Sequence, residues 1–341
     1  MTGEMEAVLV KETGAKGDWN VLEIGRIALP ALRSEEVLVR VEACSVNRAD
    51  LLQRRGLYPP PPGASSVLGL DFAGIVWETG TKATAWKRGD RVFGITAGGG
   101  YARYAAVHRD HLVPIPENLG FVEAAAAAEV FFTAHLNVFL EAGLKQGETL
   151  LLHGGGSGVG TAATQLASLA AARVLVTAGS RDRVQRCLDL GASFVINYKE
   201  EDFAARAMEL TRGEGVDVIL DWIGAPYLQK HVRILKPRGR LVLIGLMGGN
   251  TGDIHLAPLL TKRLRIIGSV LRSQSVREKA ALTASFKEKV LPLLASGAVR
   301  PVLHRVYPME AVEEAHQLMK SGAHFGKLVL SWEKPGEAQG P

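Results

Sequence analysis

The stretch "HGGGSGVG" at residues 153–160 has the residue types and spacing of a phosphate-binding loop. The apolar run "ETLLL" precedes it and the alanine-rich stretch "TAATQLASLAA" follows it. In a G-x-G-x-x-G pattern, Gly155 takes the first glycine position, Ser157 the second and Gly160 the third. These positions serve a tight turn, a close backbone approach to a pyrophosphate, and close packing of helix on strand. We therefore expect a dinucleotide on this loop, at the amino end of the helix.

The end of the next predicted strand discriminates between the two nicotinamide cofactors. An NAD site places Asp or Glu there, about 20 residues after the loop, for the ribose hydroxyls. Here the strand "RVLVTA" ends in Gly179-Ser180, and Arg181 and Arg183 follow, with Asp182 the one acid nearby. Hydroxyl and guanidinium donors suit a 2′-phosphate, so the sequence predicts NADPH. The alternative is that both arginines are solvated residues of a helix start.

The elements around the loop alternate between strands and helices. Continuous apolar strands are expected at 149–154, 173–179, 193–198, 216–224, 240–246 and 264–271. Amphipathic helices are expected between them, at 158–171, 181–191, 201–213 and 227–239. Such an alternation is typical of a doubly wound parallel sheet of about six strands, covered on both faces.

The first third of the chain differs from this pattern. Short strands are expected at 5–10, 35–46, 68–80, 90–95 and 98–108, with Gly, Pro and Asp between them. A helix is expected at 121–143. After residue 272 come a helix at 275–297, two short strands near 302–307 and 326–332 with a helix between them, and a frayed tail at 333–341. The two late strands can rejoin the first domain.

Length and composition bound the class of protein. A chain of 341 residues favours two domains. The net charge of +5 suits an anionic small ligand and gives no basic-aromatic platform for nucleic acid. Cys44 and Cys187 form no CxxC motif, and Met1–Glu6 has no signal-peptide character. No apolar run is long enough to span a membrane. These features predict a soluble cytoplasmic protein.

Several collinear motifs resemble the zinc-free quinone oxidoreductases of the medium-chain dehydrogenase/reductase superfamily. The motifs are "SVNRADLLQRRGLYPPPPGAS" (45–65), "GLDFAG" (69–74), "HGGGSGVGTAA" (153–163), "TAGS" (177–180), "NYKEEDF" (197–203), "GLMGG" (245–249) and "LRS" (271–273). The resemblance covers nearly the whole chain. It implies an α/β protein with a GroES-like β-barrel catalytic domain at 1–125, a Rossmann NADPH-binding domain at 126–272, and a return to the catalytic domain at 273–341. It also implies a homodimer formed through the Rossmann domain.

The resemblance bears directly on zinc. Zinc-dependent members carry a catalytic Cys where this chain has Asn47, and a "GHE" motif where it has Gly69-Leu70-Asp71. The two cysteines cannot supply the four-cysteine structural lobe. His108 and His111 are close in sequence, but no Cys–His–Glu cluster accompanies them. We therefore expect no metal, and without a Lewis acid the acceptor must already be a good electrophile.

The expected function is an NADPH-dependent quinone oxidoreductase that transfers a hydride without zinc. An NADPH-dependent alkenal or enoyl reductase remains open, because the same hydride can reduce a conjugated carbonyl. An NADPH-binding protein without significant turnover, RNA-binding or crystallin-like, is the alternative outside the enzymes.

The resemblance assigns site residues one by one. Asn47 and Tyr58 would line the substrate cleft and orient a quinone oxygen, and a second family tyrosine falls on Leu52. Otherwise Asn47 caps the following helix and Tyr58 packs on the prolines. The expected cofactor-binding residues are Asn47, Thr133, Gly155, Gly156, Ser157, Gly158, Val159, Gly160, Gly179, Ser180, Arg183, Tyr198, Leu246, Met247, Leu271, Arg272 and Lys327. For Thr133 an intrahelical bond, and for Arg272 a plain surface position, are the alternatives.

Overall fold

The chain divides into two compact units in the computed structural model, which describes residues 3–333. Of the described residues, unit 1 comprises 3–132 and 271–333, and unit 2 comprises 133–270. The predicted fold class, a GroES-like unit and a Rossmann-like unit, is confirmed. The expected domain limits at 125/126 and 272/273 remain predictions, and the expected tail at 333–341 lies, except for Glu333, outside the described residues.

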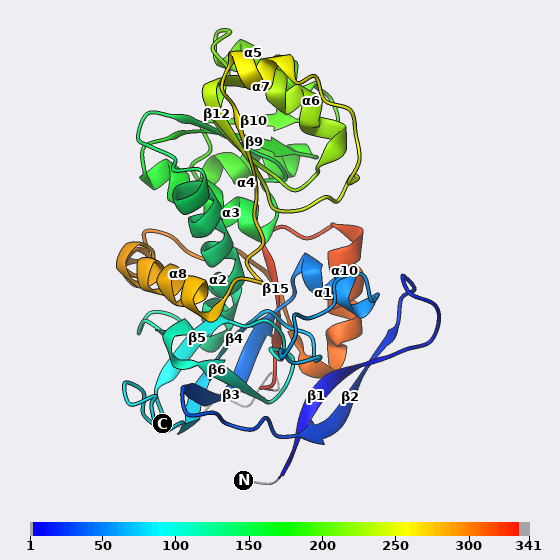
Figure 1. The fold of residues 1–341 in the computed structure, drawn as a ribbon, viewed down its shortest axis with the longest axis vertical. Helices are drawn as coiled ribbons and strands as arrows, with labels where there is room; N and C mark the ends of the chain where they lie inside the picture. Colours follow the sequence, from blue (N-terminus) through cyan, green and yellow to red (C-terminus); the bar gives the residue numbers. More distant parts are fainter. Residues whose placement is uncertain (1–2, 334–341) are drawn as a thin grey trace. The chain divides into compact units, whose positions relative to one another are not determined.

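Unit 1 is built mainly from β-strands (Figure 1). Its main sheet has the order β14-β15-β3-β4-β5-β7, with β6 paired to β3, and β1 and β2 form a separate antiparallel pair. The strands are β1 Glu4–Lys11, β2 Val21–Ala28, β3 Glu36–Ser45, β4 Asp71–Thr79, β5 Arg91–Ile95, β6 Tyr104–His108, β7 Leu112–Pro114, β14 Leu303–Pro308 and β15 Lys327–Ser331. The late strands thus pair with β3 of the first third, as the sequence suggested.

The helices of unit 1 are short and lie around this sheet. They are α1 Arg48–Arg54, η1 Arg109–His111, α8 Val276–Lys289, α9 Leu291–Ser296, η3 Met309–Ala311 and α10 Val312–Ser321, and α2 Phe121–Ala134 continues from unit 1 into unit 2. One core cluster brings Val8, Cys44, Tyr101 and Leu330 together, so residues far apart in sequence share it. This burial fixes β15 beside β3.

Unit 2 is a six-stranded parallel sheet of order β10-β9-β8-β11-β12-β13. Its strands are β8 Thr149–Leu152, β9 Arg173–Ala178, β10 Phe194–Asn197, β11 Val216–Asp221, β12 Leu235–Leu243 and β13 Arg265–Gly268. Its helices are the π-helical η2 His135–Glu141, α3 Gly158–Leu169, α4 Arg181–Asp189, α5 Phe203–Leu210, α6 Ala225–Ile234 and α7 Ala257–Thr261. The sheet buries side chains on both of its faces. On one face, Phe203 and Ala207 of α5 pack against Leu151 of β8 and Leu175 of β9.

Some elements differ from the sequence expectation. Strands β2 and β7 and helix α7 were not predicted, because they are short or lack a clear pattern. The helix expected at 227–239 ends at Ile234, where β12 begins. The helix expected at 275–297 is divided into α8 and α9, since Pro292 cannot donate the backbone hydrogen bond that would continue it.

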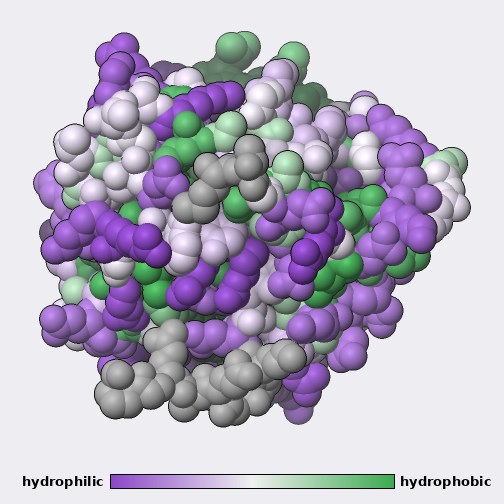
Figure 2. Space-filling view, turned by 90° about the horizontal axis from the view of Figure 1, so that it is seen from below, coloured by the Kyte–Doolittle hydropathy of each residue, from purple (hydrophilic) through white to green (hydrophobic). Residues whose placement is uncertain are grey.

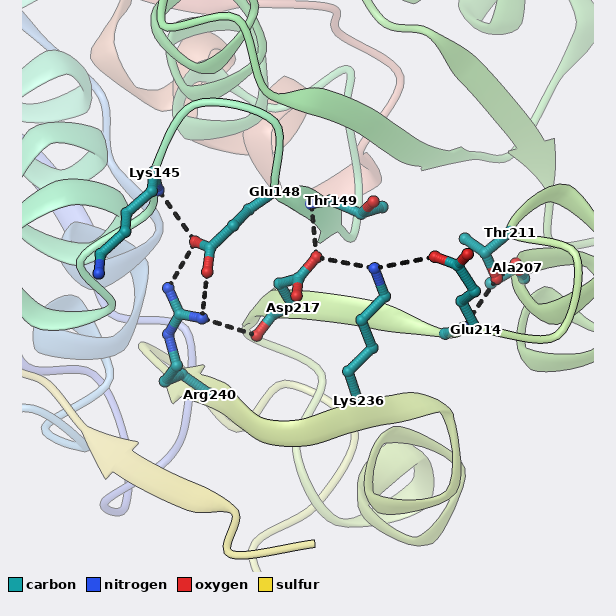
Figure 3. Close-up of polar contacts among 10 residues, drawn as sticks. Lys145, Glu148, Thr149, Ala207, Thr211, Glu214, Asp217, Lys236 and Arg240 are labelled. Atoms are coloured by element: carbon teal, nitrogen blue, oxygen red, sulfur yellow. Dashed lines mark hydrogen bonds and ion pairs between the residues drawn. The ribbon is translucent and has the colours of Figure 1, made fainter.

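The amino-terminal ends of the parallel strands are held by ion pairs (Figure 3). Arg240 donates to both carboxylate oxygens of Glu148, at 2.9 and 2.7 Å. Lys236 lies 3.2 Å from Asp217 and 3.3 Å from Glu214. In open α/β sheets ligands bind at the opposite, carboxyl ends of the strands. These ion pairs therefore belong to the sheet and not to a ligand site.

The surface of unit 1 is mixed in character. On the face in Figure 2 hydrophilic side chains predominate, with hydrophobic ones interspersed among them. Among the described residues, no helix is both long and apolar enough to cross a membrane.

Candidate functional site

The loop between β8 and α3 is shaped by its glycines. Gly154 has a φ of +56°, a left-handed conformation that glycine adopts without penalty. A Cβ at Gly155 would lie 2.0 Å from Cγ1 of Val176, and one at Gly160 would lie 2.6 Å from the carbonyl oxygen of Gly154. The loop therefore lies tightly against β9 and α3, and it leads its backbone to the amino end of α3. The turn that the sequence assigned to Gly155 belongs to Gly154.

Ser157 fills the second glycine position of the pattern and caps α3. Its Oγ accepts a hydrogen bond from the backbone N–H of Gly160 at 3.0 Å. The hydroxyl hydrogen is left to donate, and Gly158 and Val159 begin the helix beside it, after Gly156. The helix start thus combines amide dipoles with a hydroxyl donor, which is a favourable place for a phosphate.

The end of β9 carries no carboxylate, as the sequence indicated. Ser180 is exposed and caps α4, its Oγ accepting from the N–H of Arg183 at 3.4 Å. Tyr198 follows β10 and lies against Gly179, where a Cβ would be 2.7 Å from the Tyr198 hydroxyl. Asp182 lies 3.9 Å from a nitrogen of Arg186, and Glu200 lies 3.9 Å from a nitrogen of Arg181. The hydroxyls of Ser180 and Tyr198 therefore lie where an NAD site has an acid, and both nearby acids face arginines.

A chain of hydrogen bonds joins the carboxyl ends of β8 and β9 to α6. The Gly154 N–H donates to Thr177 Oγ1 at 3.1 Å, and Thr177 Oγ1 lies 3.1 Å from Nδ1 of His153. Nε2 of His153 lies 2.8 Å from Nε2 of His231. The Thr177 hydroxyl can accept from both the Gly154 amide and His153 or donate to His153, so the chain can run in either direction. Nδ1 of His231 has no hydrogen-bond partner.

These two histidines and Asp221 are the one group of three ligand-type side chains, within residues 3–333, placed closely enough for a metal ion. The 2.8 Å separation of the two imidazoles is a hydrogen bond, and His231 Nδ1 lies 3.9 Å from the Asp221 carboxylate. That carboxylate already accepts from the amides of Ile223 and Gly224, at 2.8 and 2.9 Å. The Asp221 carboxylate is therefore satisfied without a metal, whereas Nδ1 of His231 has no hydrogen-bond partner. The expectation of no metal stays a prediction.

The remaining predicted cofactor residues of unit 2 lie in different surroundings. Leu246 and Met247 follow β12 and are half exposed, with the Met247 N–H donating to the carbonyl of Trp222 at 2.9 Å. Thr133 is buried near the end of α2, and its carbonyl accepts from the Asn137 side chain at 2.8 Å. The exposed pair can contact a ligand without rearrangement, whereas Thr133 lies inside the unit.

In unit 1, Asn47 lies at the centre of a buried polar cluster. Its Nδ2 donates to Asp71 Oδ2 at 2.8 Å and to the Ser45 carbonyl at 3.2 Å. Its Oδ1 accepts from Nζ of Lys327 at 2.7 Å. Asn47 is the N-cap of α1 and forms a capping box with Asp50, whose carboxylate accepts from the Asn47 N–H at 2.7 Å. The side chain of Asn47 thus serves both the helix start and the cluster.

Burial dominates the electrostatics of this cluster. It raises the pKa of Asp50 to about 7 and also raises the pKa of Asp71, which the Lys327 ammonium partly offsets. Burial lowers the pKa of Lys327, and the charge of Asp71 opposes that effect. Tyr101 donates to Asp50 at 3.1 Å, and Cys44 beside them is buried with a raised pKa. Such a concentration of perturbed groups is typical of functional sites.

Arg272 is buried and hydrogen-bonded to three other residues, so it is not a surface arginine. It is 5% exposed, and it donates to the carbonyl of Ala97 at 2.8 Å, the carbonyl of Tyr58 at 3.0 Å and the side chain of Gln53 at 2.5 Å. Its guanidinium lies 5.0 Å from the centre of the Tyr58 ring. Burial raises the pKa of the Tyr58 hydroxyl. Arg272 therefore holds Tyr58 in place within unit 1, and Leu271 beside it is buried.

The structure brings the predicted residues together as two groups, one in each unit. The sequence reading missed Gly154, the Thr177–His153–His231 chain, and the contacts of Asp71 and Gln53. The only signal for Asp71 was an acid in the otherwise apolar stretch "LGLDFAGIV". The histidines are 78 residues apart and carried no signal of their own.

Comparisons with known proteins agree with this arrangement. The family model described as alcohol dehydrogenase GroES-like domain matches residues 33–117, and the one described as zinc-binding dehydrogenase matches residues 158–288. Human quinone oxidoreductase is 33% identical over 329 residues, which covers 96% of this chain and 97% of the relative. The chain belongs to the quinone oxidoreductases of the medium-chain dehydrogenase/reductase superfamily.

Solved structures show the same likeness. A quinone oxidoreductase from Pseudomonas syringae has a TM-score of 0.86 and 27% identity, covering 96% of this chain and 99% of its own. The Escherichia coli quinone oxidoreductase complexed with NADPH has a TM-score of 0.84 and 28% identity, with the same coverage. The chain thus corresponds to these relatives along nearly its whole length.

Proposed function

We propose that the protein is an NADPH-dependent quinone oxidoreductase. The observation that carries the proposal is the end of β9, where Ser180 and Arg183 replace the acid of an NAD site, beside a glycine loop that fits a pyrophosphate. The 33% identity to human quinone oxidoreductase and the likeness to an NADPH-complexed structure support it.

Within this function the chain's own residues bind and orient. The amino end of α3 and Ser157 hold the pyrophosphate, and Ser180, Arg183 and Tyr198 hold the adenosine 2′-phosphate. When bound, NADPH supplies a hydride, and a quinone takes up this hydride and one proton to become a hydroquinone. Asn47 and Tyr58 serve in unit 1 as the polar groups of the reaction site. The protein contributes mainly proximity and orientation.

A steady-state panel tests this proposal. NADPH and NADH oxidation are measured with 1,2-naphthoquinone, other quinones and 2-alkenals as acceptors. We expect turnover with quinones and a higher kcat/KM with NADPH than with NADH. Faster reduction of the alkenals would support the alkenal or enoyl reductase instead. Tight NADPH binding with no turnover of any acceptor would support a binding protein.

We also propose that the reaction needs no zinc. Asn47, Leu70 and Asp71 offer no thiolate or imidazole, and Lys327 places a cation beside Asn47 and Asp71. Dialysis against 1,10-phenanthroline is expected to leave quinone turnover unchanged. Loss of turnover that added Zn²⁺ restores would contradict this part of the proposal.

A homodimer through unit 2 is the proposed assembly. Strand β13 ends the parallel sheet, so its outer edge has no partner within the described chain. Ile266 on this strand is exposed, as are Leu256 and Leu260 near α7. Pairing of this edge with that of a second copy would cover both the backbone groups and the apolar side chains. Light scattering after gel filtration should give a dimer, and Ile266→Lys should give a monomer. We place this dimer in the cytoplasm, consistent with two free cysteines.

A further inference from the structure

Residues from three segments of unit 1 line a pocket of about 270 Å³, which we call the Trp19 pocket. Trp19 comes from the loop between β1 and β2, and Arg54 is the last residue of α1. Glu313, Gln317 and Lys320 come from α10, where their spacing places them on one face of the helix. Helices α1 and α10 lie next to each other in unit 1 (Figure 1).

Paired hydrogen bonds hold the walls of the Trp19 pocket. Asn20 Nδ2 donates to the Arg54 carbonyl at 2.8 Å, and Arg54 Nε donates to the Asn20 carbonyl at 2.5 Å. The Gly17 N–H donates to the Arg55 carbonyl at 2.8 Å, and Arg55 Nε donates to the Gly17 carbonyl at 2.7 Å. The loop that carries Trp19 is therefore fixed against the end of α1, so a ligand would enter a pocket that is already formed.

Arg54 brings a buried guanidinium to the pocket, and part of its donor capacity is unused. The residue is 3% exposed, and its Nη2 donates to both carboxylate oxygens of Glu313, at 2.8 and 2.7 Å. Its Nε is engaged by the Asn20 carbonyl. Nη1 has no hydrogen-bond partner within residues 3–333, and protein atoms do not enclose it completely. Both N–H groups of Nη1 can therefore donate to a ligand in the pocket.

The ring of Trp19 is surrounded by cations. The guanidinium carbons of Arg54 and Arg55 lie 5.4 and 5.2 Å from its centre, and Nζ of Lys320 lies 4.3 Å from it. Lys320 is exposed, so its ammonium can move from the ring to an anion. The lining residues carry two cations and one carboxylate, which gives the pocket a net positive charge. One negative charge would neutralise it, and a planar apolar group would cover the indole ring.

We propose that the Trp19 pocket binds a small aromatic monocarboxylate of one or two rings. Arg54 Nη1 and the Lys320 ammonium donate to the carboxylate, and the aromatic part of the ligand packs on the indole of Trp19. A pocket of about 270 Å³ suits a ligand of this size. A phosphate monoester fits less well, because its second negative charge would repel the carboxylate of Glu313. This site lies within unit 1 and does not depend on the proposed function.

Isothermal titration calorimetry of the full chain with 2-naphthoate tests the proposal. The matched ligands are 2-naphthamide, which lacks the charge, cyclohexanecarboxylate, which lacks the planar ring, and 2-naphthyl phosphate. The variants are Lys320→Glu and Trp19→Leu, and the leucine keeps an apolar side chain against the core cluster of unit 1. Lys287→Glu is the matched control, because Nζ of Lys287 also lies near a tryptophan ring, 5.4 Å from the centre of Trp86. Melting temperatures without ligand show whether each variant is folded.

We expect 2-naphthoate to bind the wild type with a Kd on the order of 0.1–1 mM, as is usual for so small a ligand. The three matched ligands should bind at least about threefold more weakly. Lys320→Glu reverses the charge of the pocket and should weaken 2-naphthoate at least about tenfold. Trp19→Leu should weaken it about three- to tenfold, since the aromatic contact is lost. Lys287→Glu should leave the Kd unchanged.

Three results would overturn the inference. One is the absence of 2-naphthoate binding at millimolar concentration. Another is the same Kd in the wild type and in Lys320→Glu, because the ligand would then bind elsewhere on the protein. The third is tighter binding of 2-naphthyl phosphate that Lys320→Glu abolishes, which would make the pocket a phosphate site. If Trp19→Leu does not fold, the exposed Lys320 still decides the question, because Lys320→Glu removes no buried side chain.

Discussion

Gly160 and Gly154 approach so closely that a Cβ on Gly160 would lie 2.6 Å from the Gly154 carbonyl oxygen. The obstructing atom belongs to the backbone, so it cannot turn aside as a side chain would. Gly160→Ala must therefore displace the loop from α3, at about 1–3 kcal/mol. We expect NADPH affinity to fall at least about tenfold. Gly268→Ala is the matched control, since a Cβ there meets nothing within 4 Å. Unchanged NADPH binding in Gly160→Ala would mean that the loop does not hold the pyrophosphate.

Arg183 tests the choice between NADPH and NADH. A charge-assisted contact with the 2′-phosphate contributes about 1.5–3 kcal/mol. Arg183→Ala should therefore weaken NADPH roughly ten- to hundredfold and leave NADH nearly unchanged, as fluorescence titration can measure. Arg206→Ala, which removes a cation paired with Glu209 elsewhere in unit 2, should affect neither cofactor. Equal losses for the two cofactors would contradict the assignment.

The buried His231 gives the free energy of unfolding a pH dependence. Burial lowers the pKa of His231 to about 3 in the folded state, whereas an unfolded histidine titrates near 6.5. Between these values the unfolded state binds more protons, so the free energy of unfolding falls as the pH falls below about 6.5. This histidine alone should lower it by about 2 kcal/mol at pH 5.

Urea unfolding at pH 7.5 and pH 5 measures this effect. His231→Gln should lose less stability on acidification than the wild type, and the exposed His255→Gln should behave like the wild type. Asp221 has a pKa raised to about 6 and acts with the opposite sign, but it is present in all three proteins. The same pH dependence in His231→Gln and the wild type would show that His231 takes a proton while buried.

The sequence was sufficient to predict those elements of the fold that are marked by the types of neighbouring residues. The parallel strands of unit 2 are continuous apolar runs, and the glycine loop follows one of them, so the strand segments along the chain and the cofactor loop could be predicted. The capping of α3 by Ser157 and of α4 by Ser180 also follows from local residue types.

The contacts that complete the site could not be predicted, because they join residues that are distant in sequence. Lys327 and Asn47 are 280 positions apart, and Arg272 and Gln53 are 219 apart. Nothing near Arg272 indicates that it is buried, since its three partners come from α1 and two loops of the first third. Only the return of β15 to β3 brings Lys327 to the polar cluster.

The last prediction concerns the amino-terminal ends of the unit 2 strands. Arg240 donates to both oxygens of Glu148 and to the carbonyls of Ala142 and Gly143, and its side chain is only 12% exposed. Arg240→Met removes its hydrogen bonds to these acceptors and leaves Glu148 only the Lys145 N–H, so it should lower the free energy of unfolding by about 2–4 kcal/mol. NADPH affinity should stay within about twofold, because the cofactor loop lies at the carboxyl ends of the same strands.

Urea unfolding and fluorescence titration of the same samples separate these two effects. Lys145→Met is the control, because only its backbone N–H, at 2.9 Å, contacts Glu148 through a hydrogen bond, and that bond survives the substitution. A loss of NADPH affinity in Arg240→Met as large as the one in Gly160→Ala would show that the two ends of the sheet are coupled. An unchanged free energy of unfolding would show that water replaces Arg240 at these acceptors, and the ion pairs would then contribute little to the stability of the sheet.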